Sequence, residues 1–142
     1  MLELSRGVRK MKRNVNLIVV FDQTKTRILM CKRKKDPYRG KYNFVGGKIK
    51  INEDHLEAAY RELKEETNIS KNEIKLTHLM DFTYYLEDTL LETYVGVLNH
   101  DVDIYGDENE LVWIDLTSDF KNDEIFAGNG NIYHIIKGAV TK

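Results

Sequence analysis

The sequence is poor in cysteine, in proline and in long apolar runs. Its 142 residues include one cysteine, Cys31, and one proline, Pro37. One cysteine excludes an intramolecular disulfide and leaves too few ligands for a zinc site of cysteine and histidine. The longest apolar run, Leu17 to Phe21, is far too short to cross a bilayer. These absences favour a reducing compartment, and we expect a cytoplasmic protein.

The sequence also lacks an excess of charge of either sign. It has 22 Lys and Arg against 23 Asp and Glu, a formal net charge of -1. Such a balance gives no general attraction to nucleic acid or to an anionic membrane, so neither partner is expected. A composition that is 42% hydrophobic and 32% charged indicates one globular domain. We predict a solvated basic tail over residues 1–13 and a domain over residues 14–142, as a monomer or a homodimer.

Strand and helix patterns are mixed along the chain without regular alternation. A β-branched apolar segment ends at Asp22, a second short strand follows it, and a basic loop containing Pro37 comes next. Strands are predicted over residues 14–22, 27–31, 76–86, 91–98 and 111–116, with a short extended piece over residues 43–47 and a closing helix over residues 132–140. This order does not support a doubly wound parallel sheet and favours a mixed one.

The residues after the Gly46-Gly47 pair predict an acidic helix. Asn52 is the expected N-cap, with Glu53 and Asp54 in the first turn, where the helix dipole favours carboxylates. Asn68 is the expected stop. The predicted buried stripe consists of Leu56, Ala59, Tyr60, Leu63 and Thr67.

Three glutamates of this helix, Glu62, Glu65 and Glu66, stand at positions i, i+3 and i+4. That spacing places their carboxylates side by side. Oxygen-only clusters suit Mg²⁺ or Mn²⁺, although acidic faces are also typical of merely solvated helices. The glycine pair and the basic residues 32–35 ahead of the helix favour a polyphosphate site with a divalent cation.

The same residues resemble the Nudix box. Gly47, five residues, Glu53, seven residues, then "RELKEETNI" from Arg61 onward match its fixed positions, except that Asn68 stands where glycine is usual. Asparagine tolerates the left-handed conformation, so the turn is expected to be kept. The resemblance extends from about Asn14 to the C-terminus. It implies an α+β fold, the Nudix α/β/α sandwich around a central mixed β-sheet, and Mg²⁺- or Mn²⁺-dependent hydrolysis of a nucleoside diphosphate linked to another moiety.

The resemblance also implies residue roles. The metal and base cluster would be Glu62, Glu65 and Glu66, the Gly46 carbonyl would add a ligand, and Glu53 and Arg61 would form a structural salt bridge. A further carboxylate is expected from the loop before the last strand. Glu108 is favoured there over Asp107 and Glu110. The predicted substrate-binding residues are Arg33, Asn43, Gly47, Lys48 and Asn131.

The segment Lys41 to Lys48 further resembles that of MutT-like enzymes, which cleave oxidised purine nucleoside triphosphates. An amide at Asn43, and another at Asn131 or Asn129, would read the purine edge; each is equally typical of a turn. The interpretation is hydrolysis of a nucleoside triphosphate to a monophosphate and pyrophosphate. Alternatives are a dinucleoside polyphosphate hydrolase, which Tyr84 and Tyr85 would suit, a nucleotide-sugar hydrolase, and an inactive nucleotide-binding module.

Overall fold

The computed structural model describes residues 11–106, 109–128 and 130–142, which form a mixed sheet between two helices. The strands are β1 (Arg13–Phe21), β2 (Arg27–Lys32), β3 (Tyr42–Asn43), β4 (Thr77–Tyr84), β5 (Thr89–Val97) and β6 (Glu110–Asp115), and the helices are α1 (His55–Thr67) and α2 (Asn131–Ala139). The strand order is β3-β2-β1-β5-β4, with β6 also paired to β2. Only β1 and β5 run parallel among the paired named strands described. The predicted mixed sheet is therefore confirmed.

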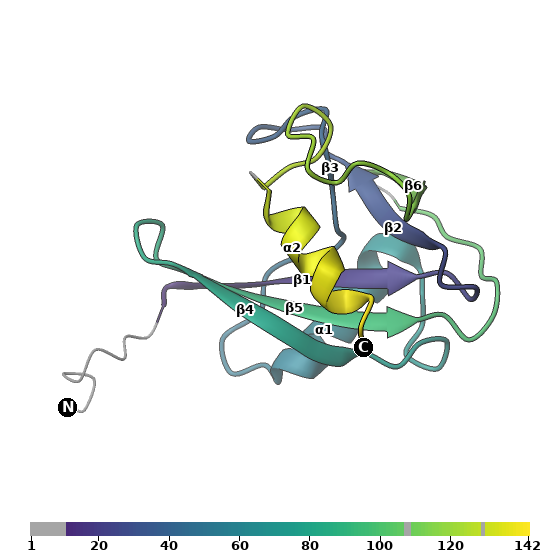
Figure 1. Cartoon of the computed structure of the whole chain (residues 1–142). Helices are drawn as coiled ribbons and strands as arrows, with labels where there is room; N and C mark the ends of the chain where they lie inside the picture. Colours follow the sequence, from purple (N-terminus) through teal and green to yellow (C-terminus); the bar gives the residue numbers. More distant parts are fainter. Residues whose placement is uncertain (1–10, 107–108, 129) are drawn as a thin grey trace.

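The two helices cover opposite faces of this sheet, so the fold has three layers (Figure 1). On β1, Ile18 and Val20 pack with α1, whereas Val19 and Phe21 pack with α2. Successive strand residues point to opposite faces, and a strand covered on both faces must be apolar on both. This burial explains the continuous apolar run, and it confirms the α/β/α sandwich.

The start of α1 differs from the prediction. Asn52 adopts a left-handed conformation, with φ of 66°, and belongs to the turn before the helix. Asp54 is the N-cap, and its side chain accepts a hydrogen bond from the Glu57 backbone N–H. The prediction of Asn52 as N-cap was wrong because two residues of the sequence, Asn52 and Asp54, can cap a helix. Glu53 consequently lies outside the helix.

The buried stripe of α1 also differs in part. The side chains of Ala59, Leu63 and Thr67 are buried as predicted, and Ala58 joins them. The prediction was wrong for Leu56, which is 38% exposed. Asn68 is confirmed as the C-cap: it is left-handed, with φ of 69°, and its N–H donates to the Lys64 carbonyl.

The predicted strands are all present, with boundary shifts of one or two residues. β1 begins at Arg13, the last residue of the predicted tail, and pairs there with Thr89 of β5. Most of that tail lies outside the described residues. β4 and β5 form the hairpin predicted around the "EDTL" turn, and it projects from the body of the sheet (Figure 1). No helix of the part of the chain described here is long and apolar enough to span a membrane.

Asp22 anchors the turn between β1 and β2. The residue is 3% exposed. Its carboxylate accepts hydrogen bonds from the backbone N–H groups of Thr26 and Arg27 at 2.9 and 3.0 Å and from the Arg27 Nε at 2.9 Å. Burial raises the pKa of this carboxyl, but the hydrogen bonds from Arg27, Thr26 and Thr24 together have a larger effect. The net result is a pKa lowered from its ordinary value to about 2. The ionised carboxylate therefore stabilises the folded state.

We expect Asp22→Asn to lower the free energy of unfolding at pH 7 by about 2 kcal/mol. A carboxyl whose pKa falls on folding contributes stability above its unfolded pKa and loses it as pH drops through its folded pKa. The difference between wild type and variant should therefore shrink between pH 4 and pH 2. Urea unfolding at several pH values measures it. The exposed Asp119→Asn is the control, and an equal effect of both changes would contradict the prediction.

Candidate active site

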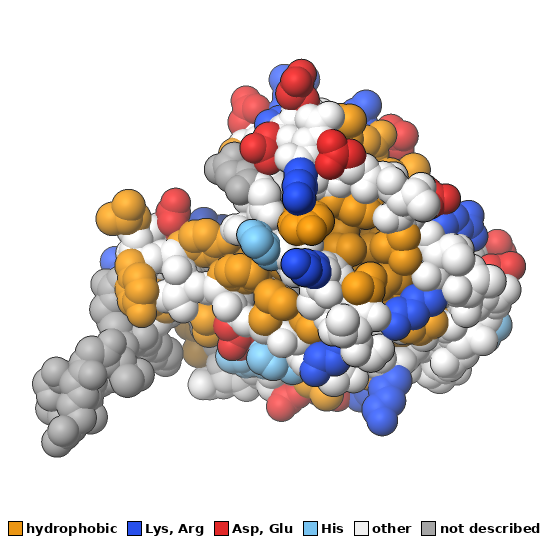
Figure 2. Space-filling model, viewed as in Figure 1, with side chains coloured by type: hydrophobic (Ala, Val, Ile, Leu, Met, Phe, Trp, Pro, Cys, Tyr) orange, Lys and Arg blue, Asp and Glu red, His pale blue; other side chains and the backbone are white. Residues whose placement is uncertain are grey.

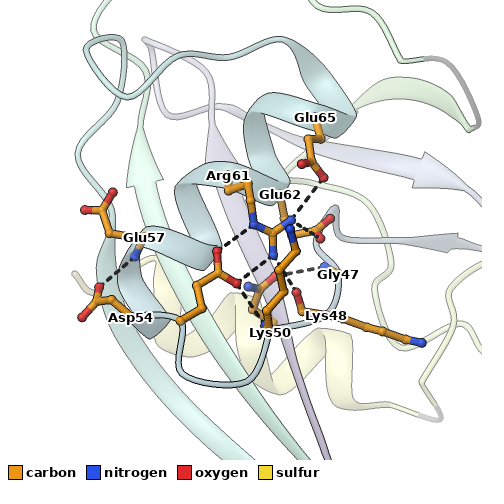
Figure 3. A network of polar contacts seen from close by, with 10 residues as sticks. Gly47, Lys48, Lys50, Asp54, Glu57, Arg61, Glu62 and Glu65 are labelled. Atoms are coloured by element: carbon orange, nitrogen blue, oxygen red, sulfur yellow. Dashed lines mark hydrogen bonds and ion pairs between the residues drawn. The ribbon is translucent and has the colours of Figure 1, made fainter.

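The guanidinium of Arg61 organises the acidic helix. Its Nε and Nη2 donate to the two carboxylate oxygens of Glu53 at 2.7 and 3.0 Å, and Nη2 also donates to the Lys48 carbonyl at 2.9 Å. Glu53 in turn accepts from the Lys50 backbone N–H. This two-pronged geometry is the strong form of an ion pair. It ties the glycine turn to the helix (Figure 3).

The same guanidinium reaches two of the three clustered glutamates. Arg61 Nη1 donates to Glu62 at 2.9 Å and to Glu65 at 3.2 Å. The side chain of Glu62 is 14% exposed and that of Glu65 is 57% exposed. Arg61 thus offsets the repulsion between neighbouring carboxylates, and Glu65 is the more open of the two to a ligand from solvent.

The glycine pair lies against the carboxylates of Glu66 and Glu62. The Gly46 N–H donates to Glu66 Oε1 at 2.8 Å. A Cβ built on Gly47 would lie 2.3 Å from Glu62 Oε1, so that carboxylate occupies the space a side chain would need. Any residue larger than glycine at position 47 would push Glu62 away. The carboxylates of Glu66 and Glu62 therefore lie against Gly46 and Gly47, and Glu65 is joined to Glu62 through Arg61.

The donor chemistry of this cluster fits a hard divalent cation. Its donors are the carboxylates of Glu62, Glu65 and Glu66 beside the Gly46 peptide, all oxygen atoms, which Mg²⁺ and Mn²⁺ prefer. Within residues 11–106, 109–128 and 130–142, no three acidic, histidine or cysteine side chains already stand in a ligating arrangement. Hydrogen bonds from Arg61 and from the Gly46 N–H hold these carboxylates, so a bound cation would have to share them with Arg61.

The Glu53–Arg61 salt bridge and the nearby Cys31 thiol have shifted pKa values. The Arg61 hydrogen bonds hold the pKa of Glu53 down at about 2, with help from the Lys50 N–H, and Glu53 in turn raises the pKa of Arg61. Burial, with a contribution from the Glu66 charge, raises the pKa of Cys31 to about 11. Cys31 therefore stays a neutral, buried thiol.

Asn16 is a site residue that the sequence reasoning missed. It lies on β1, is 1% exposed, and its Oδ1 accepts a hydrogen bond from the Gly47 N–H at 2.9 Å. The signal was present as a polar residue in an apolar strand, "NVNLIVVF", where an alternating position faces α1. Only the fold shows that this position lies beside the glycine pair.

The fourth predicted carboxylate is only partly placed. Asp107 and Glu108 lie outside the described residues, and Glu110 begins β6 opposite Lys32. The chain just before them lies against the end of α1. There the Tyr105 N–H donates to the Thr67 carbonyl at 3.2 Å, and a Cβ on Gly106 would lie 2.6 Å from the Glu66 carbonyl oxygen. The described residues before the gap therefore lie against the C-terminal end of α1.

The predicted substrate-binding side chains come from separate elements. Arg33 follows β2, and its Nε donates to the Pro37 carbonyl at 2.7 Å. Asn43 ends β3, and its Oδ1 accepts from the Phe44 N–H at 2.8 Å. The exposed Lys48 contacts Arg61 through its backbone carbonyl. None of the three is joined to the clustered glutamates by its side chain in the contacts of the described residues.

Asn131 is the first residue of α2, on the opposite side of the sheet from α1. Its Nδ2 donates to the Tyr84 hydroxyl at 2.6 Å, which joins α2 to the end of β4. Burial raises the pKa of Tyr84, so the hydroxyl remains neutral. This contact leaves Asn131 Oδ1 as the acceptor of the amide. Asn129, the other candidate in this loop, lies outside the described residues.

A hollow on the α2 face lies apart from these groups (Figure 2). Its volume is about 320 Å³, and its lining includes Leu116, Phe120, Tyr133 and Ile136 together with Lys121 and Lys137. None of the predicted site residues lines it. The chemistry indicated by the acidic helix therefore belongs to the α1 side of the sheet.

Comparison with known protein families identifies the family to which this chain belongs. A profile of the NUDIX domain family matches residues 11–132, most of the chain and all of the acidic helix. No curated protein sequence matches this chain significantly.

Solved structures give the same result for the fold. Dihydroneopterin triphosphate pyrophosphohydrolase of E. coli has a TM-score of 0.70 at 21% identity and covers 91% of this chain and 96% of its own. An Ap4A hydrolase of C. elegans has a TM-score of 0.68 at 20% identity, covering 89% and 98%. A MutT NUDIX hydrolase of Burkholderia pseudomallei has a TM-score of 0.62 at 23% identity, covering 84% and 93%. At such low identities the likeness shows the fold alone.

We expect Arg61→Lys to raise the pKa of Glu53 from about 2 towards its ordinary value near 4.5. A lysine presents a single charged nitrogen and cannot reproduce the paired hydrogen bonds of the guanidinium. A carbon-detected NMR titration of the glutamate carboxyls measures this pKa. Lys71→Met, which removes only the surface partner of Glu57, is the control. An unchanged Glu53 titration in Arg61→Lys would contradict the assignment.

Proposed function

Because this chain belongs to the NUDIX domain family and is a Nudix hydrolase, we propose that it cleaves a nucleoside triphosphate to a monophosphate and pyrophosphate. The observation that carries this proposal is the glutamate cluster at the glycine turn: Glu66 and Glu62 lie against Gly46 and Gly47, and Glu65 shares the Arg61 guanidinium with Glu62. An oxygen cluster of this kind beside a glycine turn suits a phosphate chain carried with a divalent cation.

The proposed cofactor is Mg²⁺ or Mn²⁺. Glu65 and Glu66 are the proposed main ligands, with Glu62, the Gly46 carbonyl and a loop carboxylate, Glu108 in our assignment, completing the set. When bound, such a cation neutralises phosphate charge and lowers the pKa of water. The support from the structure is the all-oxygen donor set and the space that Gly47 leaves for the Glu62 carboxylate.

The chain's own groups supply the remaining chemistry. Arg61 and Glu53 hold the turn and the helix at a fixed separation, which keeps the carboxylates aligned with the Gly46 peptide. A carboxylate of the cluster accepts the proton of the attacking water.

The proposed substrate contacts come from several elements outside the acidic helix. Arg33 and Lys48 would meet phosphate oxygens, while Asn43 and Asn131 would read the base. The Asn131 amide donates to Tyr84 and keeps its oxygen for an N–H donor on the base edge. A triphosphate is favoured by analogy with the structurally similar E. coli enzyme, whose name states a triphosphate substrate.

A second substrate class has specific support. The C. elegans protein of similar fold is named as an Ap4A hydrolase, and Tyr84 provides the tyrosine expected for dinucleoside polyphosphates. A nucleotide sugar and a binding module without catalysis remain further alternatives. A cytoplasmic location is proposed together with the triphosphate reaction, since nucleotide pools and reduced cysteine coincide there.

We expect Glu65→Gln to reduce Mg²⁺-dependent pyrophosphate release by about 100-fold or more. The amide keeps the size of the side chain but removes its charge and its basicity. Pyrophosphate detection with a purine nucleoside triphosphate measures the rate. Glu57→Gln, on the same helix and paired only with Lys71 among its side-chain contacts, is the matched control. Wild-type protein that binds nucleotide without turnover would overturn the enzymatic proposal.

We expect Asn131→Ala to reduce kcat/KM for the preferred triphosphate by about 10-fold, mainly through KM, because one polar contact to the base is lost. The measurement compares oxidised and normal triphosphates, a dinucleoside polyphosphate and a nucleotide sugar by their phosphate products. Asn99→Ala, an exposed amide beside Asn72, is the control. A preference for a non-triphosphate would overturn the substrate class and leave the family unchanged.

A further inference from the structure

Asn16 is a buried amide next to the apolar residues of its row on β1. It lies on β1 and is 1% exposed. Ile18 and Val20, which follow it on the same face, pack in the core beneath α1. Burying an amide among such neighbours is unfavourable unless its polar atoms find partners. The polar atoms of the Asn16 amide should therefore have hydrogen-bond partners that offset this cost.

Asn16 makes a hydrogen bond to each of the two peptide units that flank the Gly47 Cα. Its side-chain Oδ1 accepts from the Gly47 N–H at 2.9 Å, and its backbone N–H donates to the Gly47 carbonyl at 2.8 Å. Gly46 lies directly against the Asn16 backbone, since a Cβ there would be 2.1 Å from the Asn16 carbonyl oxygen. The turn is thus docked on β1 at this residue.

Because a peptide unit is planar, the hydrogen bond to the Gly47 N–H also fixes the orientation of the carbonyl at the other end of that unit. The Gly47 N–H and the Gly46 carbonyl belong to one trans peptide unit, so they lie in one plane and point in opposite directions. Once Asn16 Oδ1 fixes the direction of the N–H, the direction of the Gly46 carbonyl is fixed as well. Glycine at position 46, with φ of 151°, could otherwise rotate over a wide range.

The other half of the amide has no partner. Asn16 Nδ2 is buried and makes no hydrogen bond to any group that the structure describes. Buried donors are normally satisfied, and an isosteric apolar residue would avoid this cost. The asparagine is therefore poorly explained by stability alone, and its oxygen has the one clear task of orienting the glycine peptide.

We infer that Asn16 is a positioning residue for the cation site: its side-chain oxygen aims the Gly46 carbonyl at the ion held by Glu65 and Glu66. This inference rests on the proposed function, because it takes that carbonyl as a cation ligand. Groups that orient ligands from behind typically change metal affinity or activity by 10–100-fold when removed. The expected signature is weaker cation binding in a protein that remains folded.

The test measures Mn²⁺ binding directly, by electron paramagnetic resonance of the free ion, in purified full-length protein. Asn16→Leu and Asn16→Ala both remove the oxygen acceptor, and we expect each to weaken Mn²⁺ binding about 10-fold or more. Asn16→Asp keeps an oxygen in place and is expected to bind Mn²⁺ at least as well as wild type. Asn14→Ala is the matched control, with the same residue type on the same face of β1, two positions earlier.

Thermal melting in the presence of a chelator separates positioning from folding. The inference holds if Asn16→Leu or Asn16→Ala melts within a few degrees of Asn14→Ala and binds Mn²⁺ more weakly. It is overturned if both bind as tightly as Asn14→Ala, if Asn16→Asp fails as they do, or if both are unfolded, which would make Asn16 a determinant of the fold. Wild type that binds no Mn²⁺ would instead overturn the proposed function.

Discussion

The Arg61 guanidinium joins segments that would otherwise be independent. It contacts Glu53 before the helix, Glu62 and Glu65 within it, and the Lys48 carbonyl in the turn. Each carboxylate alone would repel the others, and the glycine turn alone has little to hold it. A planar group with several fixed donors meets both requirements at once, which a lysine could not do. Arg61 thereby offsets much of the repulsion among the carboxylates that it contacts.

The fold and much of the site could be predicted from the sequence because their signals are local. The spacing of Glu62, Glu65 and Glu66, the left-handed stop at Asn68 and the apolar strands depend on neighbouring residues only. The helix start was predicted wrongly, since Asn52 and Asp54 offer competing caps two residues apart. Asn16 could not be found this way, because its partner Gly47 is distant in sequence and meets it only through the sheet.

The two faces of the sheet carry different groups of candidate site residues. The α1 face carries the carboxylates and the glycine turn, whereas the α2 face carries Asn131 and its Tyr84 partner. β1 serves both, since its alternate residues anchor the two cores and Asn16 docks the turn. The candidate reactive carboxylates lie on α1 against the sheet, and the recognition candidates lie at the ends of other elements or in loops. Substrate preference is therefore free to vary without disturbing the cluster.

The low pKa of Glu53 has a consequence for the behaviour of the site in acid. With a pKa of about 2, this carboxylate keeps its charge throughout the range in which most proteins stay folded. The ion pair between turn and helix therefore stays charged well below neutral pH. A loss of activity at moderately acid pH would then have to come from groups other than this ion pair.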